Sequence, residues 1–231
     1  MSGIIKICGV MQVAHVEAAA AAGADLIGFN FAESRRRVSP EFARDAVGRA
    51  KAINPAVRAV GLFVDASPET ISQVYEESGV DLVQLHGMPS VETVERLGLP
   101  ALVAVRVNPD RSSEALSEYI ASMATTDLVE MILLDAYHPT LAGGTGLLAD
   151  WERAADLARR ARLMLAGGLN PGNVAFAIKA VRPAAVDVSS GVETDGVKNP
   201  ELISAFVTNA RVAFAANGYS TSSGTSSHDA P

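Results

Sequence analysis

The sequence predicts an α/β protein, a single (β/α)₈ barrel with parallel strands. Short apolar runs rich in β-branched residues alternate with alanine-rich helical segments along nearly the whole chain. This alternation is typical of parallel strands joined by crossover helices. The length of 231 residues is usual for one such barrel, and glycine-rich turns follow the last two apolar runs, where many barrels bind phosphate.

The apolar runs give the expected strands in order. The first four cover residues 4–8, 26–31, 59–64 and 82–85, and the second four cover residues 101–106, 131–135, 163–166 and 185–188. An open doubly wound sheet is the alternative architecture. That sheet would carry its phosphate-binding glycines after the first strand, whereas here they cluster after the seventh and eighth runs.

Four dipeptides mark expected helix starts. Ser39-Pro40, Ser67-Pro68, Asn170-Pro171 and Asn199-Pro200 each place an N-cap residue before a proline at the first helical position, where its missing N–H does no harm. We expect the barrel to form one catalytic domain over residues 1–216. Residues 217–231 are polar and of low complexity, so we expect a disordered tail that activity does not need.

Composition excludes several classes of protein. Hydrophobic residues make up 48% and charged residues 19% of the chain, with a mean hydropathy of +0.20, as in a compact globular enzyme. The net charge of −7 argues against a nucleic-acid-binding protein, which needs a basic face. No apolar stretch approaches the ~18 residues of a membrane span, and no leader precedes the first strand. We therefore expect a cytoplasmic protein without a membrane or nucleic-acid partner.

Cys8 is the only cysteine and ends the first predicted strand. It cannot form an intramolecular disulfide, and one sulfur does not make a thiolate metal cage, so we expect no metal. A buried, inert packing thiol is the alternative. Alternation along the strand puts Lys6 on the same face as Cys8. Asp187 lies on the eighth strand, which would close the barrel beside the first, so we hypothesise a buried Lys6–Asp187 pair beneath Cys8.

Other polar residues also stand at predicted strand ends. They are His86, Arg106, Asp135, Asp187 and Ser189. The active sites of such barrels lie at the carboxyl ends of the strands, so we expect these side chains to share one site. By parity, Asp135 points inward with Leu133 and Met131.

The two late glycine-rich turns predict a phosphate site. Gly167 and Gly168 follow the seventh run, and Ser189, Ser190 and Gly191 follow the eighth. Backbone N–H groups of such turns bind phosphate because glycine lets the anion approach closely. Ordinary tight turns are the alternative. We expect a sugar phosphate or a similar small molecule as ligand.

Two further motifs lie in predicted loops. Arg35, Arg36 and Arg37 follow the second run. A guanidinium fork there could hold a carboxylate at two points, although a charge run is often only a solvated loop. The run Gly143-Gly144-Thr145-Gly146 resembles a flexible lid rather than a Walker loop, because no Gly-Lys-Ser/Thr follows.

Taken together, these motifs resemble those of the phosphoribosylanthranilate isomerase family. The resemblance runs from Ile4 to about Ala215 and depends on the order of many short motifs. They are Lys6-Ile7-Cys8-Gly9, Gly28-Phe29-Asn30-Phe31, Arg36 through Ser39-Pro40, Val60-Gly61-Leu62-Phe63-Val64, Gln84-Leu85-His86-Gly87, Leu133-Leu134-Asp135, Gly143-Gly144-Thr145-Gly146 with Asp150-Trp151, Gly167-Gly168-Leu169-Asn170-Pro171 and Asp187-Val188-Ser189-Ser190-Gly191-Val192-Glu193.

The resemblance implies an Amadori rearrangement in tryptophan biosynthesis, an aldose–ketose isomerisation that needs no cofactor and no metal. It implies Cys8 as general base, Asp135 as general acid and Arg36 as the ligand of the substrate's aromatic carboxylate, with phosphate at the late glycine turns. With Arg36, we expect His86, Arg106 and Asp187 to bind the phosphoribosyl substrate. We expect a monomer or a homodimer.

Departures from the family pattern leave the breadth of substrates open. Arg37 stands where the family commonly has tyrosine, and Leu147 where a polar residue often follows the glycine run. The related isomerase of histidine biosynthesis resembles the chain less, because it has an aspartate where this chain has Cys8. Activity on both substrates stays an alternative, as does a non-catalytic phosphate-binding barrel with Cys8 as packing.

Overall fold

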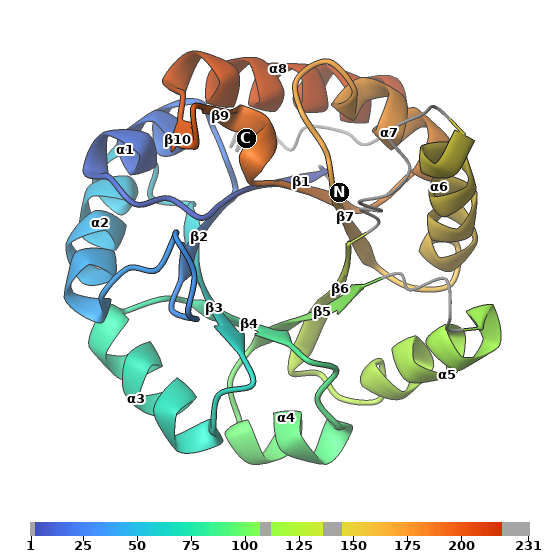
Figure 1. Ribbon diagram of the computed structural model, residues 1–231, viewed down its shortest axis with the longest axis horizontal. Coiled ribbons are helices and arrows are strands. Elements are labelled where there is room, and N and C mark those ends of the chain that lie inside the picture. The colour runs from blue at the N-terminus through green and yellow to red at the C-terminus, as the bar shows by residue number, and fades with distance from the viewer. Residues whose placement is uncertain (1–2, 107–111, 136–144, 219–231) are drawn as a thin grey trace, which may run out of the picture.

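The computed structural model describes residues 3–106, 112–135 and 145–218. Eight parallel strands form a closed barrel in the order in which they occur in the chain, and β8 pairs with β1 (Figure 1). The strands are β1 Ile4–Cys8, β2 Leu26–Asn30, β3 Arg58–Val64, β4 Leu82–His86, β5 Ala101–Arg106, β6 Val129–Asp135, β7 Leu163–Ala166 and β8 Ala185–Val188. The predicted (β/α)₈ barrel is therefore confirmed, and the open sheet is excluded by the β1–β8 pairing.

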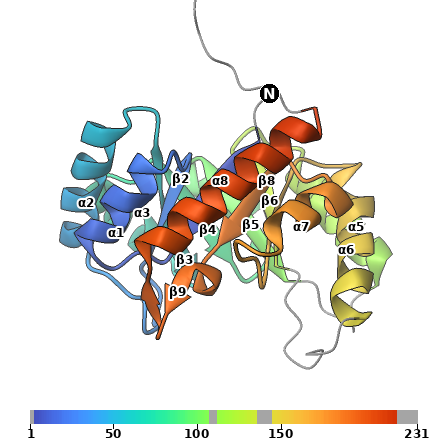
Figure 2. The ribbon, with the colours of Figure 1, turned by 90° about the horizontal axis from the view of Figure 1, so that it is seen from above.

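Helices follow the strands and form the outer ring of the barrel (Figure 1). They are α1 Val13–Ala21, α2 Pro40–Ile53, α3 Pro68–Ser78, α4 Val91–Leu97, α5 Ser113–Met123, α6 Thr145–Ala158, α7 Val174–Val181 and α8 Pro200–Ala216. Helix α8 contacts both α1 and α7 and runs across the outside of the barrel between them (Figure 2). The last helix thus covers the seam where the first and last strands pair.

The side chains of the strands form two separate apolar layers because successive residues point to opposite faces. Ile5 and Ile7 of β1 belong to the layer between strands and helices. The layer inside the barrel includes Val60, Leu102 and Leu133 from β3, β5 and β6. The predicted parity is confirmed, since Lys6 and Cys8 alternate with the two isoleucines and face inward.

Three of the four predicted helix starts are correct. Ser39, Ser67 and Asn199 each accept a backbone N–H of the first helical turn, and each precedes a proline. The prediction at Asn170-Pro171 is wrong, because α7 begins at Val174. Asn170 Oδ1 accepts the N–H of Gly172 at 2.8 Å. This Asx turn competes with a helical start and delays it.

The segment between β8 and α8 contains three short elements that were not predicted. After β8, a short 3₁₀ turn at Ser190–Val192 leads into a two-stranded antiparallel hairpin, β9 Glu193–Thr194 and β10 Val197–Lys198. Asp195 and Gly196 at its tip both have positive φ angles, 51° and 79°, as tight hairpin turns require. The hairpin lies between the last barrel strand and α8.

Two predictions fall on residues outside the described ranges. Gly143 and Gly144 of the lid-like run lie outside them, as do residues 219–231 of the predicted tail. The described chain ends just after α8, so the predicted domain boundary at residue 216 stays a prediction. Among the described residues, no helix is both long and apolar enough to cross a membrane.

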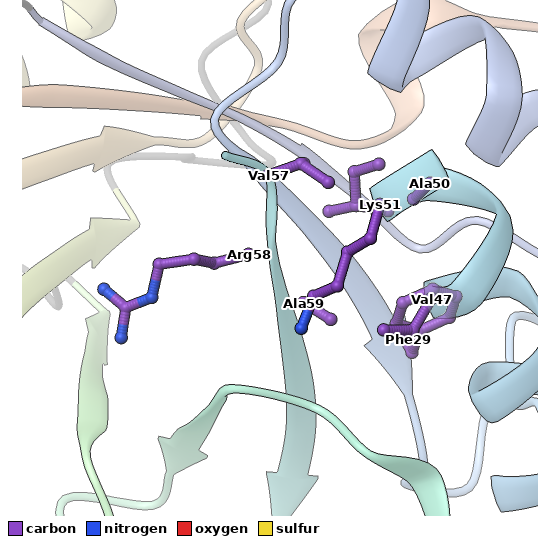
Figure 3. A pocket seen from close by; sticks show the side chains of 8 residues that line it. Phe29, Val47, Ala50, Lys51, Val57, Arg58 and Ala59 are labelled. Carbon is purple, nitrogen blue, oxygen red and sulfur yellow. The ribbon is translucent and has the colours of Figure 1, made fainter. Parts of the chain in front are cut away.

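An ion pair crosses the foot of the barrel, at the amino ends of the strands. Arg58 of β3 donates to both carboxylate oxygens of Glu130 in β6, at 2.8 and 2.7 Å. Figure 3 shows Arg58 extending away from a small apolar gap between α2 and β3, whereas Lys51 of α2 lies beside that gap. Two-point pairing of this kind fixes the guanidinium plane and ties together strands that are not neighbours.

Arg211 of α8 fastens the last helix to the start of the barrel. It donates to the carbonyl oxygens of Gly3 and Gly23, at 2.6 and 2.8 Å, and to Asp25 Oδ2 at 2.7 Å. Asp25 Oδ2 also accepts the backbone N–H of Ile5 at 2.7 Å. One guanidinium therefore binds an acceptor just before β1 and two acceptors just before β2.

We predict that Arg211→Met lowers the free energy of unfolding by about 1–3 kcal/mol, since its partners lose charge-assisted hydrogen bonds. Arg49→Met is the matched control. Among the described residues, Arg49 pairs with exposed carboxylates at the surface, so its loss costs about 0.5 kcal/mol or less. Urea unfolding of both variants measures the difference, and equal losses would contradict this role of Arg211.

Candidate active site

The carboxyl ends of the strands surround a cavity of about 520 Å³. Every residue that the sequence proposed for catalysis, substrate binding or phosphate binding lines it. These residues are Cys8, Arg36, His86, Arg106, Asp135, Gly167, Gly168, Asp187, Ser189, Ser190 and Gly191. Residues that are distant in the sequence meet here because all eight strands end on the same side of a parallel barrel.

A buried ion pair lies beneath the cavity. Lys6 Nζ is 3.0 Å from Asp187 Oδ1, and the two side chains are 0% and 9% exposed. The register of β1 and β8 places the two residues directly opposite each other, which confirms the pair hypothesised from parity. Burial lowers the pKa of Lys6, but Asp187 and Cys8 together outweigh burial, so the pKa lies above its ordinary value and the ammonium stays charged.

Cys8 lies directly above this pair. A side chain at Gly28 of β2 would place its Cβ 2.9 Å from Cys8 Sγ and 3.3 Å from Lys6 Nζ, so the sulfur and the ammonium both pack over that glycine. Burial raises the pKa of the Cys8 thiol, while Lys6 opposes the shift and Asp187 adds to it. The thiol is consequently protonated at neutral pH in the unliganded protein.

Asp135 reaches the cavity from the end of β6. Strands β7 and β8 separate it from β1 along the barrel wall. Its Oδ2 lies 3.8 Å from Nε of Arg106, the last residue of β5. The Arg106 side chain is largely exposed, so this contact is a weak ion pair and leaves the guanidinium accessible at the rim of the cavity.

His86, at the end of β4, is a neutral imidazole. Its burial, and then the nearby Lys6 ammonium, lower its pKa to about 4. The amide nitrogen of Gln84 lies 2.8 Å from His86 Nε2. An amide N–H donates there, so Nε2 accepts and the single ring proton lies on Nδ1.

The two glycine-rich turns pack tightly against each other. Gly167 and Gly168 both have positive φ angles, 95° and 66°. A Cβ on Gly191 would lie 1.8 Å from the carbonyl oxygen of Leu169. No side chain fits at that distance, so glycine is required where the turn after β8 contacts the turn after β7. The arrangement leaves an open backbone surface at the place where barrels bind phosphate.

The guanidinium of Arg36 has a protein partner that the sequence analysis did not assign. Arg36 Nε donates to Glu193 Oε1 at 2.8 Å, and Nη2 donates to Glu193 Oε2 at 2.9 Å. Arg35, which is mostly exposed, reaches the same carboxylate, and Arg37 pairs with Glu33 at the surface. Only Arg36 of the three arginines lines the cavity.

Sequence reasoning therefore missed Gln84, which lines the cavity, and it missed Glu193 and Lys198, which contact the lining residues Arg36 and Ser189. Glu193 belongs to the motif after β8, but its spacing gives no sign of a contact with a loop more than 150 residues earlier. Lys198 lies in the hairpin, which was not predicted. Gln84 carried a signal, because parity places it inside the barrel two residues before His86.

Comparison with known proteins identifies a family. The family model described as N-(5′-phosphoribosyl)anthranilate (PRA) isomerase matches residues 5–209. The chain is 45% identical to the N-(5′-phosphoribosyl)anthranilate isomerase of Roseiflexus castenholzii over 214 residues, 91% of this chain and 99% of that one. It is 41% identical to that of Acetivibrio thermocellus over 220 residues, covering 90% and 96%.

Solved structures are also similar to the chain. The phosphoribosyl anthranilate isomerase of Thermotoga maritima is 36% identical, with a TM-score of 0.77, over 92% of this chain and all of that one. An isomerase in complex with reduced 1-(o-carboxyphenylamino)-1-deoxyribulose 5-phosphate is 35% identical, with a TM-score of 0.75 and the same coverage. With the match of the family model over most of its length, the chain belongs to the N-(5′-phosphoribosyl)anthranilate isomerase family.

Proposed function

We propose that this isomerase converts N-(5-phosphoribosyl)anthranilate into 1-(2-carboxyphenylamino)-1-deoxyribulose 5-phosphate with Cys8 as general base and Asp135 as general acid. The observation that carries the proposal is that both groups line one cavity with the glycine turns and Arg36. A similar isomerase is known in complex with a reduced form of that product. The product carries a phosphate, an aminopentulose and an aromatic carboxylate. These three correspond to the glycine turns, to Cys8 with Asp135, and to Arg36 around this cavity.

The reaction requires an acid and a base on different atoms. Protonation of the furanose ring oxygen by Asp135 opens the ring and leaves an iminium at C1. The iminium acidifies the proton on C2, which Cys8 then removes to give an enolamine, and the enolamine tautomerises to the aminoketose. No hydride donor is needed, because C1 is reduced while C2 is oxidised within one molecule.

The charges around Cys8 set the conditions for that proton transfer. The thiol is protonated before substrate arrives, since burial raises its pKa. Lys6 favours the thiolate, but Asp187 holds Lys6 and moderates its field. The iminium brings a further positive charge at the moment when the base is needed. Asp187 therefore serves the site by holding Lys6.

Binding is divided between the two sides of the cavity. The turns at Gly167–Gly168 and Ser189–Gly191 are proposed to bind the phosphate through backbone N–H groups. Arg36 is proposed to bind the aromatic carboxylate. His86, which is neutral, and Arg106, which lies beside Asp135, line the same cavity and are proposed to contact the ribose portion.

The quaternary structure that we propose is a monomer or a homodimer. A Thermotoga maritima relative, 35% identical with a TM-score of 0.74, is dimeric and has also been obtained as monomers. We also propose that the isomerase works in the cytoplasm, and its membership of a family of biosynthetic enzymes supports this.

We predict that Cys8→Ser and Asp135→Asn each lower kcat by about 10²- to 10⁴-fold, the usual contribution of a general acid or base. KM should change little, because neither group carries the binding of phosphate or carboxylate. Steady-state turnover of phosphoribosylanthranilate measures both constants, with Asp45→Asn on the exposed face of α2 as control. Wild-type activity in either site variant would refute its assigned role.

The pH dependence should follow Cys8 and not His86. Because burial raises the pKa of Cys8, we predict that the inflection of kcat/KM contributed by Cys8 lies above pH 8, and that Cys8→Ser removes it. His86, with a pKa of about 4, stays neutral throughout and adds no inflection near 6.5. An acidic limb near pH 6.5 that disappears in His86→Gln would contradict the prediction.

The packing of the two phosphate turns gives a third test. We predict that Gly191→Ala raises KM about tenfold or more, because a Cβ there would push the turn away from Leu169 and overpacking of this size costs about 1–3 kcal/mol. Gly48→Ala on α2 is the matched control, since a Cβ at that position meets no atom within 4 Å. Unchanged KM in folded Gly191→Ala would show that the turns do not bind the phosphate.

A further inference from the structure

Glu193 is a buried carboxylate on which several cations converge. Its side chain is only 4% exposed, although it stands at the start of a surface hairpin. It pairs with Arg36 at 2.8 Å, with Lys198 at 2.8 Å and with Arg35 at 3.0 Å. Burial opposes ionisation, but hydrogen bonds from Arg36 and Lys198 outweigh it and lower the pKa of Glu193 to about 2. The carboxylate is therefore charged under all working conditions.

The edge of Arg36 that Glu193 occupies matters for function. Glu193 accepts from Nε and Nη2, which form the side edge of the guanidinium. Nη1 has no hydrogen-bond partner in the part of the chain that the structure describes. A guanidinium has five N–H donors in a fixed plane, so Nη1 and the second proton of Nη2 form a free end edge. That edge can donate two hydrogen bonds to a second carboxylate.

The loop after β1 also restricts the position of the Arg36 side chain. Its Cδ would lie 2.7 Å from a Cβ on Gly9, so the stem of the arginine packs directly on the backbone next to Cys8. Gly9 has a φ of 74°, which glycine adopts without strain. The guanidinium is thus held between the loop after β1 and the hairpin.

Lys198 connects Glu193 to the predicted phosphate turn. The lysine is 3% exposed, and its Nζ donates to Glu193 Oε1 at 2.8 Å and to the carbonyl oxygen of Ser189 at 2.8 Å. The β9–β10 register pairs Lys198 with Glu193 directly. One carboxylate therefore links Arg36, on the loop after β2, with Ser189, on the turn after β8.

We propose that Glu193 is a positioning residue that presents the free edge of Arg36 to the aromatic carboxylate of the substrate. This inference rests on the proposed function, because it assigns the carboxylate to Arg36. Through Lys198, Glu193 also sets the distance between the carboxylate-binding arginine and the phosphate-binding turn. The enzyme would then bind the carboxylate and the phosphate of its substrate with Arg36 and the turn after β8, and the buried Glu193 carboxylate would hold both of these in place.

Glu193→Gln tests this role, because the amide keeps the shape but turns one acceptor into a donor that faces the arginine. Two substrates are compared, phosphoribosylanthranilate and the corresponding phosphoribosylaniline, which lacks the carboxyl group. For the anthranilate we expect KM to rise about tenfold or more, as for loss of a charge-assisted contact, with kcat within about threefold. For the aniline, which keeps the phosphate but lacks the carboxylate, we expect a much smaller rise in KM, because Lys198 keeps its hydrogen bond to the carbonyl oxygen of Ser189 in the variant.

Two further variants make the result specific. Arg36→Met should show the same substrate-dependent loss, and the double variant should lose little more than Arg36→Met alone, because the two residues act through one contact. Glu33→Gln is the matched control, since Glu33 is exposed and pairs with Arg37 on the same loop. It should behave as wild type on both substrates.

Several outcomes would overturn the proposal. Equal losses on both substrates would show that Glu193 only supports the fold, and a lower KM would show that it competes with the substrate for Arg36. If Glu193→Gln does not fold, Glu193→Asp replaces it, because the shorter carboxylate does not reach Nε and Nη2 of Arg36 in the same position and should give the same substrate-dependent loss; wild-type KM for the anthranilate would then refute the proposal. Failure of the unmodified enzyme to isomerise the anthranilate would refute the proposed function instead.

Discussion

The site depends on the closure of the sheet between β1 and β8. This pairing places Lys6 opposite Asp187, and the two side chains are 0% and 9% exposed. An ammonium and a carboxylate can be buried there only because each neutralises the other at 3.0 Å. The pair forms the polar floor of the cavity, and Cys8 lies one inward-facing position above it. If the first and last strands did not meet, the thiol would have neither its depth nor its charged neighbours.

The electrostatics of the cavity follow from which charges are balanced within the protein. Lys6 is matched by Asp187, and Glu193 is matched by Arg36 and Lys198. Cys8 is buried and His86 is partly buried, each without an ion-pair partner among the described residues, and desolvation keeps both neutral near pH 7. The cavity thus keeps a protonated thiol and a neutral imidazole beside charged groups. Such a site suits a reaction that moves protons within one substrate.

Substrate recognition and barrel closure use different parts of the chain. The strands place Cys8, His86 and Asp135, whereas the groups that we propose to bind the anionic ends of the substrate come from loops after β2, β7 and β8. Loops alone would hold these groups loosely. Glu193 and Lys198 connect the loop after β2 with the turn after β8. Close packing of Gly191 on Leu169 holds the turn after β8 against the turn after β7. Preorganisation of this kind lowers the entropy lost on binding.

The sequence by itself determined the class of fold, the strands that form it and the inward direction of Lys6, Cys8 and Asp135. It could do so because alternation along a strand is local and because all strands of a parallel barrel end on one side. Two of the four Asn/Ser-Pro pairs illustrate the limit: Ser39 caps α2 as predicted, but the Asx turn at Asn170 delays α7. Only the tertiary structure decided the partner of Arg36, since the contact with Glu193 joins loops that no local pattern relates. It also decided the protonation of Cys8, because desolvation and the distances to Lys6 and Asp187 exist only once the barrel is closed.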